Sequence, residues 1–240
     1  MLSFLRRTWR SNHLSLFNSL RRCESWQKRT LITESIEPPI VSKVPEKPCT
    51  FVFLEDQGLY PGSWGTLLRD CLPSEHGIHF CHQYLNPPSM KEALHEMKQD
   101  LASFPAIVLM TRGPTVSLLA QYYLESLPLA GLIMVDPIVE PLPSDCLDSL
   151  QKMYSLESNR ERAMLQSLQM DIETRKLKLE AGVIPMFVVS TIPSMEDQSL
   201  ATVLRHNNPN SPHGEVYFSK LIEIEKILPL VIRWIEDNVL

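Results

Sequence analysis

Residues 105–128 read PAIVLMTRGPTVSLLAQYYLESLP, and this stretch decides the fold. Its first part, 106–110, is solidly apolar, as a strand buried on both faces of a parallel sheet should be. Pro114 then suits the first turn of a helix, because the N–H that proline lacks would be unpaired there in any case. The sequence therefore predicts a buried strand that turns directly into a helix over 114–127, which is the repeating unit of parallel α/β domains.

The same alternation of short apolar runs and helical patterns continues on both sides. Further strands are expected at 49–54, 78–85, 129–135, 184–190 and 214–219, and further helices at 65–72, 90–104 and 222–240. Ser89 and Glu92 form a capping box at the start of the second of these helices. Because a parallel sheet needs helices on both faces, the pattern predicts a mainly parallel α/β sheet of about six strands.

The composition is that of a globular domain and excludes several other classes. The chain has 240 residues, 44% hydrophobic and 21% charged, and contains no apolar run long enough for a transmembrane helix. Its five cysteines show no C-x-x-C spacing, which indicates reduced thiols and argues against a disulfide scaffold or a structural zinc site. Beyond residue 33 the chain has 16 basic and 27 acidic side chains, which argues against a nucleic-acid-binding domain.

The first 33 residues differ from the rest in charge. They hold seven basic side chains and one acidic side chain, with serines and with apolar residues at helical spacing. This composition is typical of a mitochondrial transit peptide. We therefore expect import to the mitochondrial matrix, or to the matrix side of the inner membrane, with cleavage near Arg29. The alternative is a basic arm that binds a membrane surface or nucleic acid.

Two segments depart from the α/β pattern. The Pro-rich stretch 34–48 predicts an extended linker, so that the folded domain is expected to span 49–240. Residues 144–181 are mostly charged, with apolar residues at helical spacing and no strand signal. They predict a helical insertion, which either covers its own domain or acts as a docking face.

The order of these elements resembles the α/β-hydrolase fold. FVFLEDQGLYPGSWGTLL (51–68) resembles the family's strand, oxyanion loop and following helix, and residues 105–128 resemble its nucleophile elbow. Four further segments of this chain resemble the family's later strands and its closing helix: LAGLIMVDP (129–137), IPMFVVST (184–191), GEVYFSKL (214–221) and ILPLVIRWIEDNVL (227–240). The insertion at 144–181 lies where the family has its lid. The resemblance implies this fold over 49–240 and lies in the layout, not in catalytic motifs.

The elbow positions that the resemblance implies are degenerate. The family pattern is G-x-S-x-G, and the five positions here are Thr111, Arg112, Gly113, Pro114 and Thr115. Gly113 stands at the nucleophile position and has no side chain. The next residue, Pro114, has no N–H to donate to an oxyanion. Two β-branched threonines replace the small flanking glycines, which makes a tight elbow harder to form.

The other catalytic positions depart from the family pattern as well. Glu55 and Asp56 stand at the oxyanion-loop position, where two carboxylates would repel a developing oxyanion. The only nearby histidine, His213, precedes the last predicted strand, although the family's base follows it. Asp136 and Asp197 follow strands that carry the acid in this family. We keep Asp136 as a candidate residual acid, although capping a turn is the commoner role.

A histidine cluster raises the question of a metal. His76, His79 and His82, with Cys81, have close spacing. Positions 79 and 82 of one strand point to opposite faces of a sheet, so these side chains should not converge. We therefore predict no metal site and no cofactor.

Three further side chains are candidates for a role in catalysis or anion binding. Ser117 lies one helical turn past the elbow, and Ser63 lies in a turn with no histidine placed for it. Arg112 would either bind an anion at the helix N-terminus or pair with a nearby carboxylate at the surface, and the second is favoured. None of these supplies the missing chemistry in a simple way.

These observations favour a protein that keeps the scaffold and has lost the chemistry. We expect a non-catalytic structural or interaction subunit of a larger assembly, with other mitochondrial proteins as partners. One alternative is a hydrolase of the esterase, lipase or thioesterase kind with relocated catalytic residues. Another is a carrier that holds a small molecule beneath the lid without turnover.

Overall fold

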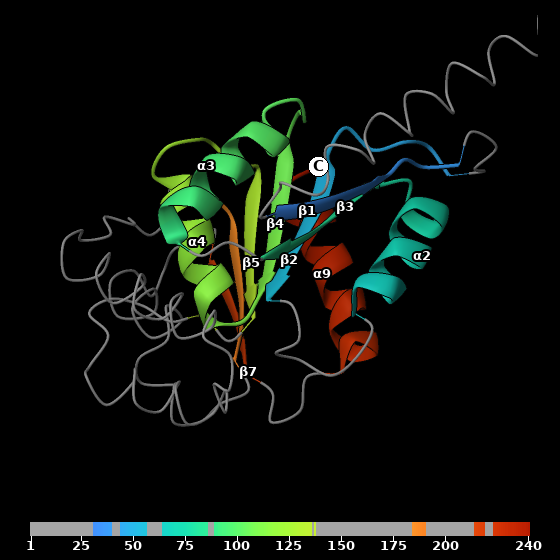
Figure 1. The fold of residues 1–240 in the computed structure, drawn as a ribbon. Helices are drawn as coiled ribbons and strands as arrows, with labels where there is room; N and C mark the ends of the chain where they lie inside the picture. Colours follow the sequence, from blue (N-terminus) through green and yellow to red (C-terminus); the bar gives the residue numbers. More distant parts are fainter. Residues whose placement is uncertain are drawn as a thin grey trace, which may run out of the picture.

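A seven-stranded sheet with helices on both faces forms the body of the computed structural model (Figure 1). The structure describes residues 31–39, 44–56, 64–85, 89–135, 137, 184–190, 214–218 and 223–240. The strands are β1 (Leu31–Ile36), β2 (Thr50–Asp56), β3 (His79–Leu85), β4 (Ile107–Arg112), β5 (Gly131–Val135), β6 (Met186–Ser190) and β7 (Gly214–Phe218). The helices are α2 (Trp64–His76), α3 (Met90–Leu101), α4 (Pro114–Leu124) and α9 (Ile224–Asn238). The predicted α/β class is confirmed.

The strand order creates one topological switch point. The strands lie in the order β1-β3-β2-β4-β5-β6-β7, and all pairs from β3 to β7 are parallel. From β2 the chain moves to β3 on one side and then returns to β4 on the other. The carboxyl ends of the parallel strands meet at one edge of the sheet, and the ends of β2 and β4 mark the switch point, which is where open α/β sheets usually bind ligands.

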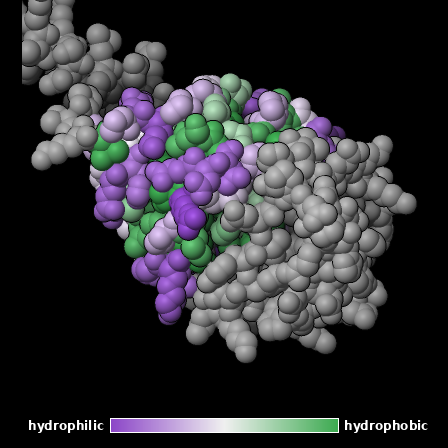
Figure 2. Space-filling model, turned by 180° about the vertical axis from the view of Figure 1, so that it is seen from behind, coloured by the Kyte–Doolittle hydropathy of each residue, from purple (hydrophilic) through white to green (hydrophobic). Residues whose placement is uncertain are grey.

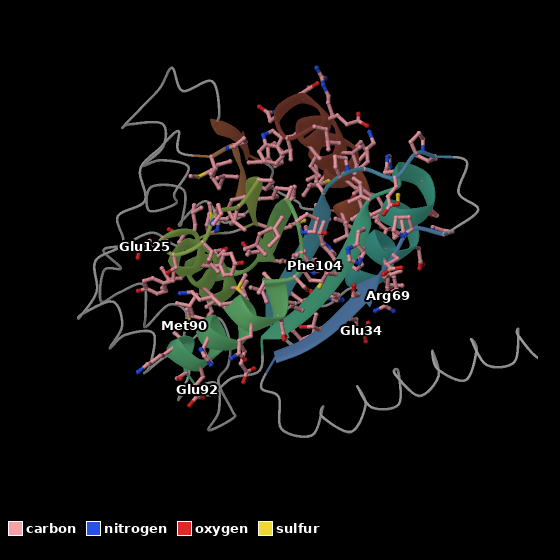
Figure 3. The ribbon with its side chains drawn as sticks, turned by 90° about the horizontal axis from the view of Figure 1, so that it is seen from above. Glu34, Arg69, Met90, Glu92, Phe104 and Glu125 are labelled. Atoms are coloured by element: carbon pink, nitrogen blue, oxygen red, sulfur yellow. The ribbon has the colours of Figure 1, made fainter. Side chains whose placement is uncertain are left out.

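Alternate residues of each strand divide the core into two layers. One layer joins the sheet to α3 and α4, and it includes Val52, Leu109 and Leu132. The other joins the sheet to α2 and α9, and it includes Phe53, Met110 and Trp234. Figure 3 looks down on this arrangement from above. All six residues of β4 are buried, which explains the uninterrupted apolar run that predicts this strand.

Local signals explain the helix boundaries. The amide of Glu92 donates to Ser89 Oγ at 3.3 Å, which confirms the predicted cap of α3. Helix α9 buries Ile227, Val231 and Trp234 among other apolar residues on one face. None of the helices in the described ranges has the length and apolarity needed to cross a bilayer. In Figure 2 hydrophilic and apolar side chains are mixed over the described surface seen there.

The prediction of a linker before residue 49 is wrong in part, because the sheet begins at Leu31. Strand β1 pairs antiparallel with β3, with Ser35 opposite Cys81, and so covers an edge that β3 would otherwise expose. The predicted boundary at residue 33 therefore falls within a strand. The sequence does not predict this strand, because the prolines that follow it suggest a linker and because its partner, β3, lies more than 40 residues further along the chain. The predicted insertion at 144–181 and residues 1–30 lie outside the described residues.

Side chains on both faces of β1 attach it to the domain. Thr33 Oγ1 donates to Asp100 Oδ2 at 2.8 Å, and Gln83 Nε2 donates to Thr33 Oγ1 at 3.1 Å. On the other side Arg69 donates to the carboxylate of Glu34. These contacts connect β1 to α3, β3 and α2.

We expect hydrogen exchange to distinguish a strand from a linker. The amides of 31–36 that point at β3 should exchange more slowly than those of Glu37 and Glu46, which are exposed and lie outside the helices and strands, because the former belong to a β-ladder. Replacing Arg69→Met removes the ion pair with Glu34 and should speed exchange in β1 by roughly 1.5- to 5-fold, since exposed pairs contribute about 0.2–1 kcal/mol. Arg233→Met, on the exposed face of α9, is the control and should leave β1 unchanged. Equal exchange for the amides of 31–36 that point at β3 and for those of Glu37 and Glu46 would contradict the strand.

Candidate functional site

The turn between β4 and α4, where the resemblance places the nucleophile elbow, is formed by Gly113. Gly113 connects the strand to the helix with φ 114° and ψ 164°. Its N–H donates to the carbonyl of Val135 at 2.9 Å, which holds the turn against β5. A positive φ of this size strains residues with a side chain and is accessible to glycine. The position therefore offers a backbone turn and no reactive group.

Ser117, the nearest hydroxyl along α4, is bound inside the core. Its Oγ donates to the carbonyl of Gly113 at 2.6 Å and lies 3.0 Å from Thr111 Oγ1. Thr111 Oγ1 also lies 3.5 Å from the carbonyl oxygen of Ile133, to which it can donate. Ser117 and Thr111 are both fully buried, and Thr115 is buried beside them. In this arrangement Ser117 caps the turn and presents no nucleophile to solvent.

Arg112 lies on the opposite face of the sheet from Thr111. Its guanidinium carbon is 4.2 Å from the ring centroid of Trp64, and the residue is 8% exposed. A planar guanidinium stacks well on an indole face, and this contact is strongest when water is excluded. The prediction that Arg112 lies at the surface is therefore wrong. It is packed under the first turn of α2.

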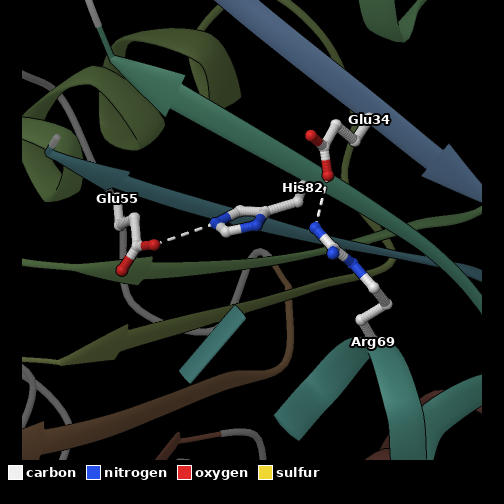
Figure 4. A network of polar contacts seen from close by, with 4 residues as sticks. All are labelled: Glu34, Glu55, Arg69 and His82. Atoms are coloured by element: carbon white, nitrogen blue, oxygen red, sulfur yellow. Dashed lines mark hydrogen bonds and ion pairs between the residues drawn. The ribbon is translucent and has the colours of Figure 1, made fainter. Parts of the chain in front are cut away.

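Glu55 and His82 form a second polar contact on the same face (Figure 4). His82 Nε2 lies 3.0 Å from Glu55 Oε1, and the two side chains are 1% and 14% exposed. A carboxylate accepts hydrogen bonds, so Nε2 carries the proton that is shared with it. Glu55 is also the register neighbour of Arg112 across β2 and β4. We call Glu55, Trp64, His82 and Arg112 the switch-point cluster, because they surround the ends of β2 and β4.

The imidazole of His82 is enclosed on all the sides that the structure describes. Its ring centroid lies 5.2 Å from that of Phe53 and 4.1 Å from that of Tyr84. A Cβ added to Gly65 would lie 2.1 Å from His82 Cε1, so only glycine lets α2 approach this closely. His82 Nδ1 is buried and has no hydrogen-bond partner among the described residues. His82 is therefore a buried imidazole whose Nε2 is engaged by Glu55.

A second ion pair lies near the cluster, between α2 and β1. Arg69 of α2 pairs with Glu34 of β1, and Figures 3 and 4 show the two side chains meeting between these elements. Burial raises the pKa of the Tyr84 phenol, Glu55 and Glu34 raise it further, and Arg69 opposes them. Burial and the two carboxylates therefore both favour the neutral form of this phenol.

The predicted divergence of the strand histidines is confirmed. His79 faces α3, where its ring lies 5.3 Å from that of Phe104 and its nitrogens contact Ser35 Oγ at 2.7 Å and Thr50 Oγ1 at 3.3 Å. Burial lowers the pKa of His79, and nearby carboxylates partly oppose the shift. His82 faces α2. The two rings therefore cannot share a metal ion.

Several predicted site residues are not placed by the structure. Asp56 ends β2, and its side chain is not described. The candidate acid Asp136, the candidate nucleophile Ser63, and Asp197 and His213 lie outside the described residues. Pro114 begins α4 as predicted. These placements leave the switch-point cluster and the Gly113 turn as the candidate site.

Comparison with known proteins finds similarity in structure only. No family model and no curated protein matches the sequence. An esterase from Thermogutta terrifontis matches with a TM-score of 0.58 and 11% identity, covering 88% of this chain and 94% of its own. An α/β hydrolase from Sphaerobacter thermophilus matches with a TM-score of 0.51 and 12% identity, covering 85% and 95%. The chain has the α/β-hydrolase fold.

This fold does not by itself select a reaction. An epoxide hydrolase from Bacillus megaterium also matches, with a TM-score of 0.53 and 12% identity over 86% of this chain and 96% of that one. A protein described as cleaving the ring of the Pseudomonas quinolone signal matches with a TM-score of 0.58 and 10% identity over 86% and 96%. Such different chemistry on one α/β-hydrolase scaffold means that function must be argued from the site.

We expect the contact between Gly65 and His82 to be visible in a double-mutant cycle. Gly65→Ala should lower the free energy of unfolding by about 1–3 kcal/mol, because the added methyl overpacks the imidazole. In a His82→Ala background the same change should be neutral or stabilising, since alanine is up to about 1 kcal/mol better than glycine in a helix. Urea unfolding measures both effects, with the exposed neighbour Thr66→Ala as control. An equal effect in both backgrounds would contradict the proposed clash.

Proposed function

We propose that this protein is a non-catalytic α/β-hydrolase-fold protein that acts as a structural or interaction subunit of a larger mitochondrial assembly. The observation that carries the proposal is Gly113. The turn between β4 and α4 keeps a positive φ, yet it presents no side chain where acyl-transfer chemistry needs a nucleophile. The following residue, Pro114, has no N–H to offer an oxyanion.

The polar groups around the turn support the same conclusion. An oxyanion needs donors that point at it, whereas β2 contributes the carboxylate of Glu55. That carboxylate is already bound to His82, and Arg112 is stacked on Trp64. Glu55 is therefore engaged by His82, and Arg112 is packed against an aromatic ring, which supports a structural role for both side chains.

The alternative, a hydrolase with relocated residues, receives less support. Ser117 is buried, and its hydroxyl is used to bind the carbonyl of Gly113. Among the described histidines near this edge, His82 is enclosed and paired with Glu55. A relocated site would have to use Ser63 or other residues outside the described ranges.

The mitochondrial part of the proposal comes from the first 33 residues. Their seven basic side chains and single acidic one make an amphipathic, Ser-containing segment of the transit-peptide kind. Cleavage near Arg29 would leave β1 intact, since this strand begins at Leu31. The proposed partners are other proteins of the same organelle.

A serine-directed fluorophosphonate probe tests the lack of catalysis. The purified protein should show no covalent labelling, whereas an active serine esterase labelled in parallel provides the positive control. Gly113→Ser should also remain unlabelled, because the described residues place neither an accessible base nor oxyanion donors beside the new hydroxyl. Labelling of the unchanged protein that disappears in Ser63→Ala or Ser117→Ala would establish the hydrolase alternative. Labelling gained in Gly113→Ser would show that the rest of the machinery is intact.

Fractionation of intact mitochondria by size tests the subunit role. The protein should migrate with a large complex, and its N-terminus in those fractions should begin close to Leu31 after cleavage near Arg29. Migration as a free monomer would contradict a subunit role. Absence from purified mitochondria would contradict the proposed location.

A further inference from the structure

The last turn of α2 brings together three different metal-binding side chains. Cys71, Glu75 and His76 offer a thiol, a carboxylate and an imidazole whose ligand atoms all lie within 4.8 Å of one another. The thiol of Cys71 donates to Glu75 Oε2 at 3.3 Å. Cys71 and His76 are half-buried and Glu75 is exposed, so an ion from solvent can reach the group. Cys49 and Cys81, the other free cysteines that the structure describes, are buried.

This group lies at the opposite end of α2 from the switch-point cluster. Trp64 begins the helix beside the carboxyl edge of the sheet, and His76 ends it just before β3 starts at His79. The helix therefore carries the group to the amino edge, away from Gly113 (Figure 1). A ligand bound by this group would therefore be independent of the proposed loss of catalysis at Gly113.

The backbone at this end of α2 is held in place. Gly77 ends the helix with φ 66°, and a Cβ there would lie 2.3 Å from the carbonyl oxygen of Pro45. Lys47 N–H donates to the carbonyl of Gly77 at 2.8 Å, and Ile78 N–H donates to that of Leu72 at 3.1 Å. Ligands on a fixed backbone need only rotate their side chains to close on an ion, which lowers the cost of binding.

The donor types select the kind of ion. Zn²⁺ accepts thiolate, imidazole and carboxylate ligands at about 2.0–2.3 Å in tetrahedral geometry, so its donor atoms lie about 3.5 Å apart. The contact between Cys71 and Glu75 already has this length, and His76 needs a small side-chain movement. Ca²⁺ and Mg²⁺ prefer oxygen ligands alone. We propose that Cys71, Glu75 and His76 bind a zinc-class divalent cation, with a fourth position open to water and with the thiol proton released to solvent.

The test uses Co²⁺ as a spectroscopic probe of a thiolate site. The reduced full-length chain should carry Cys23→Ser and Cys146→Ser, which removes the two cysteines outside the described ranges. Adding Co²⁺ should produce a near-ultraviolet thiolate-to-cobalt absorption that saturates at one ion per chain and disappears when Zn²⁺ is added.

Variants assign the signal to the three side chains. Cys71→Ser should abolish the absorption. Glu75→Gln and His76→Gln should each weaken Co²⁺ binding by about 10-fold or more, since even groups that only orient a metal ligand contribute about 10- to 100-fold. His95→Gln, an exposed histidine on α3, is the matched control and should bind as before; thermal unfolding confirms that each variant is folded. No absorption at millimolar Co²⁺, absorption that survives Cys71→Ser, or unchanged affinity in both Glu75→Gln and His76→Gln would overturn the proposal.

Discussion

The backbone reverses at a single residue, Gly113, between a strand buried on both faces and a helix that packs back against it. Strand β4 is buried along its whole length. Strands β2 and β5 flank it, and helices cover both of its faces. The chain changes direction at Gly113, whose φ of 114° is readily accessible to glycine. The N–H of Gly113 donates to Val135, and Ser117 donates to the carbonyl of Gly113. These bonds hold β5 and α4 against the turn.

The polar side chains near this reversal stabilise the interior of the domain. Glu55, His82 and Arg112 would be expensive to bury alone, and each has a partner in another element: Glu55 and His82 bind one another, and Arg112 stacks on Trp64. Gly65 completes the arrangement by letting α2 come close to the imidazole. These contacts join β2, β3, β4 and α2 at the switch point of the sheet.

The two ends of α2 make different contacts. Its first turn closes over the switch-point cluster and so joins the helix to the carboxyl edge. Its last turn is tied by Gly77 to the segment before β2, and it presents Cys71, Glu75 and His76 together. A bound cation there would fix the amino edge of the domain without involving the turn at Gly113, so the fold would be stabilised from both ends of one helix.

The sequence by itself determined the alternation of strands and helices from β2 onwards, the cap of α3 and the glycine at the elbow, because burial period and turn chemistry are local properties. It also predicted that His79 and His82 face opposite sides, which follows from the period of a strand. It did not reveal β1, the stacking of Arg112 on Trp64, or the pairing of Glu55 with His82. Each of these depends on a partner that is remote along the chain, and only the register of the sheet and the position of α2 bring the two together.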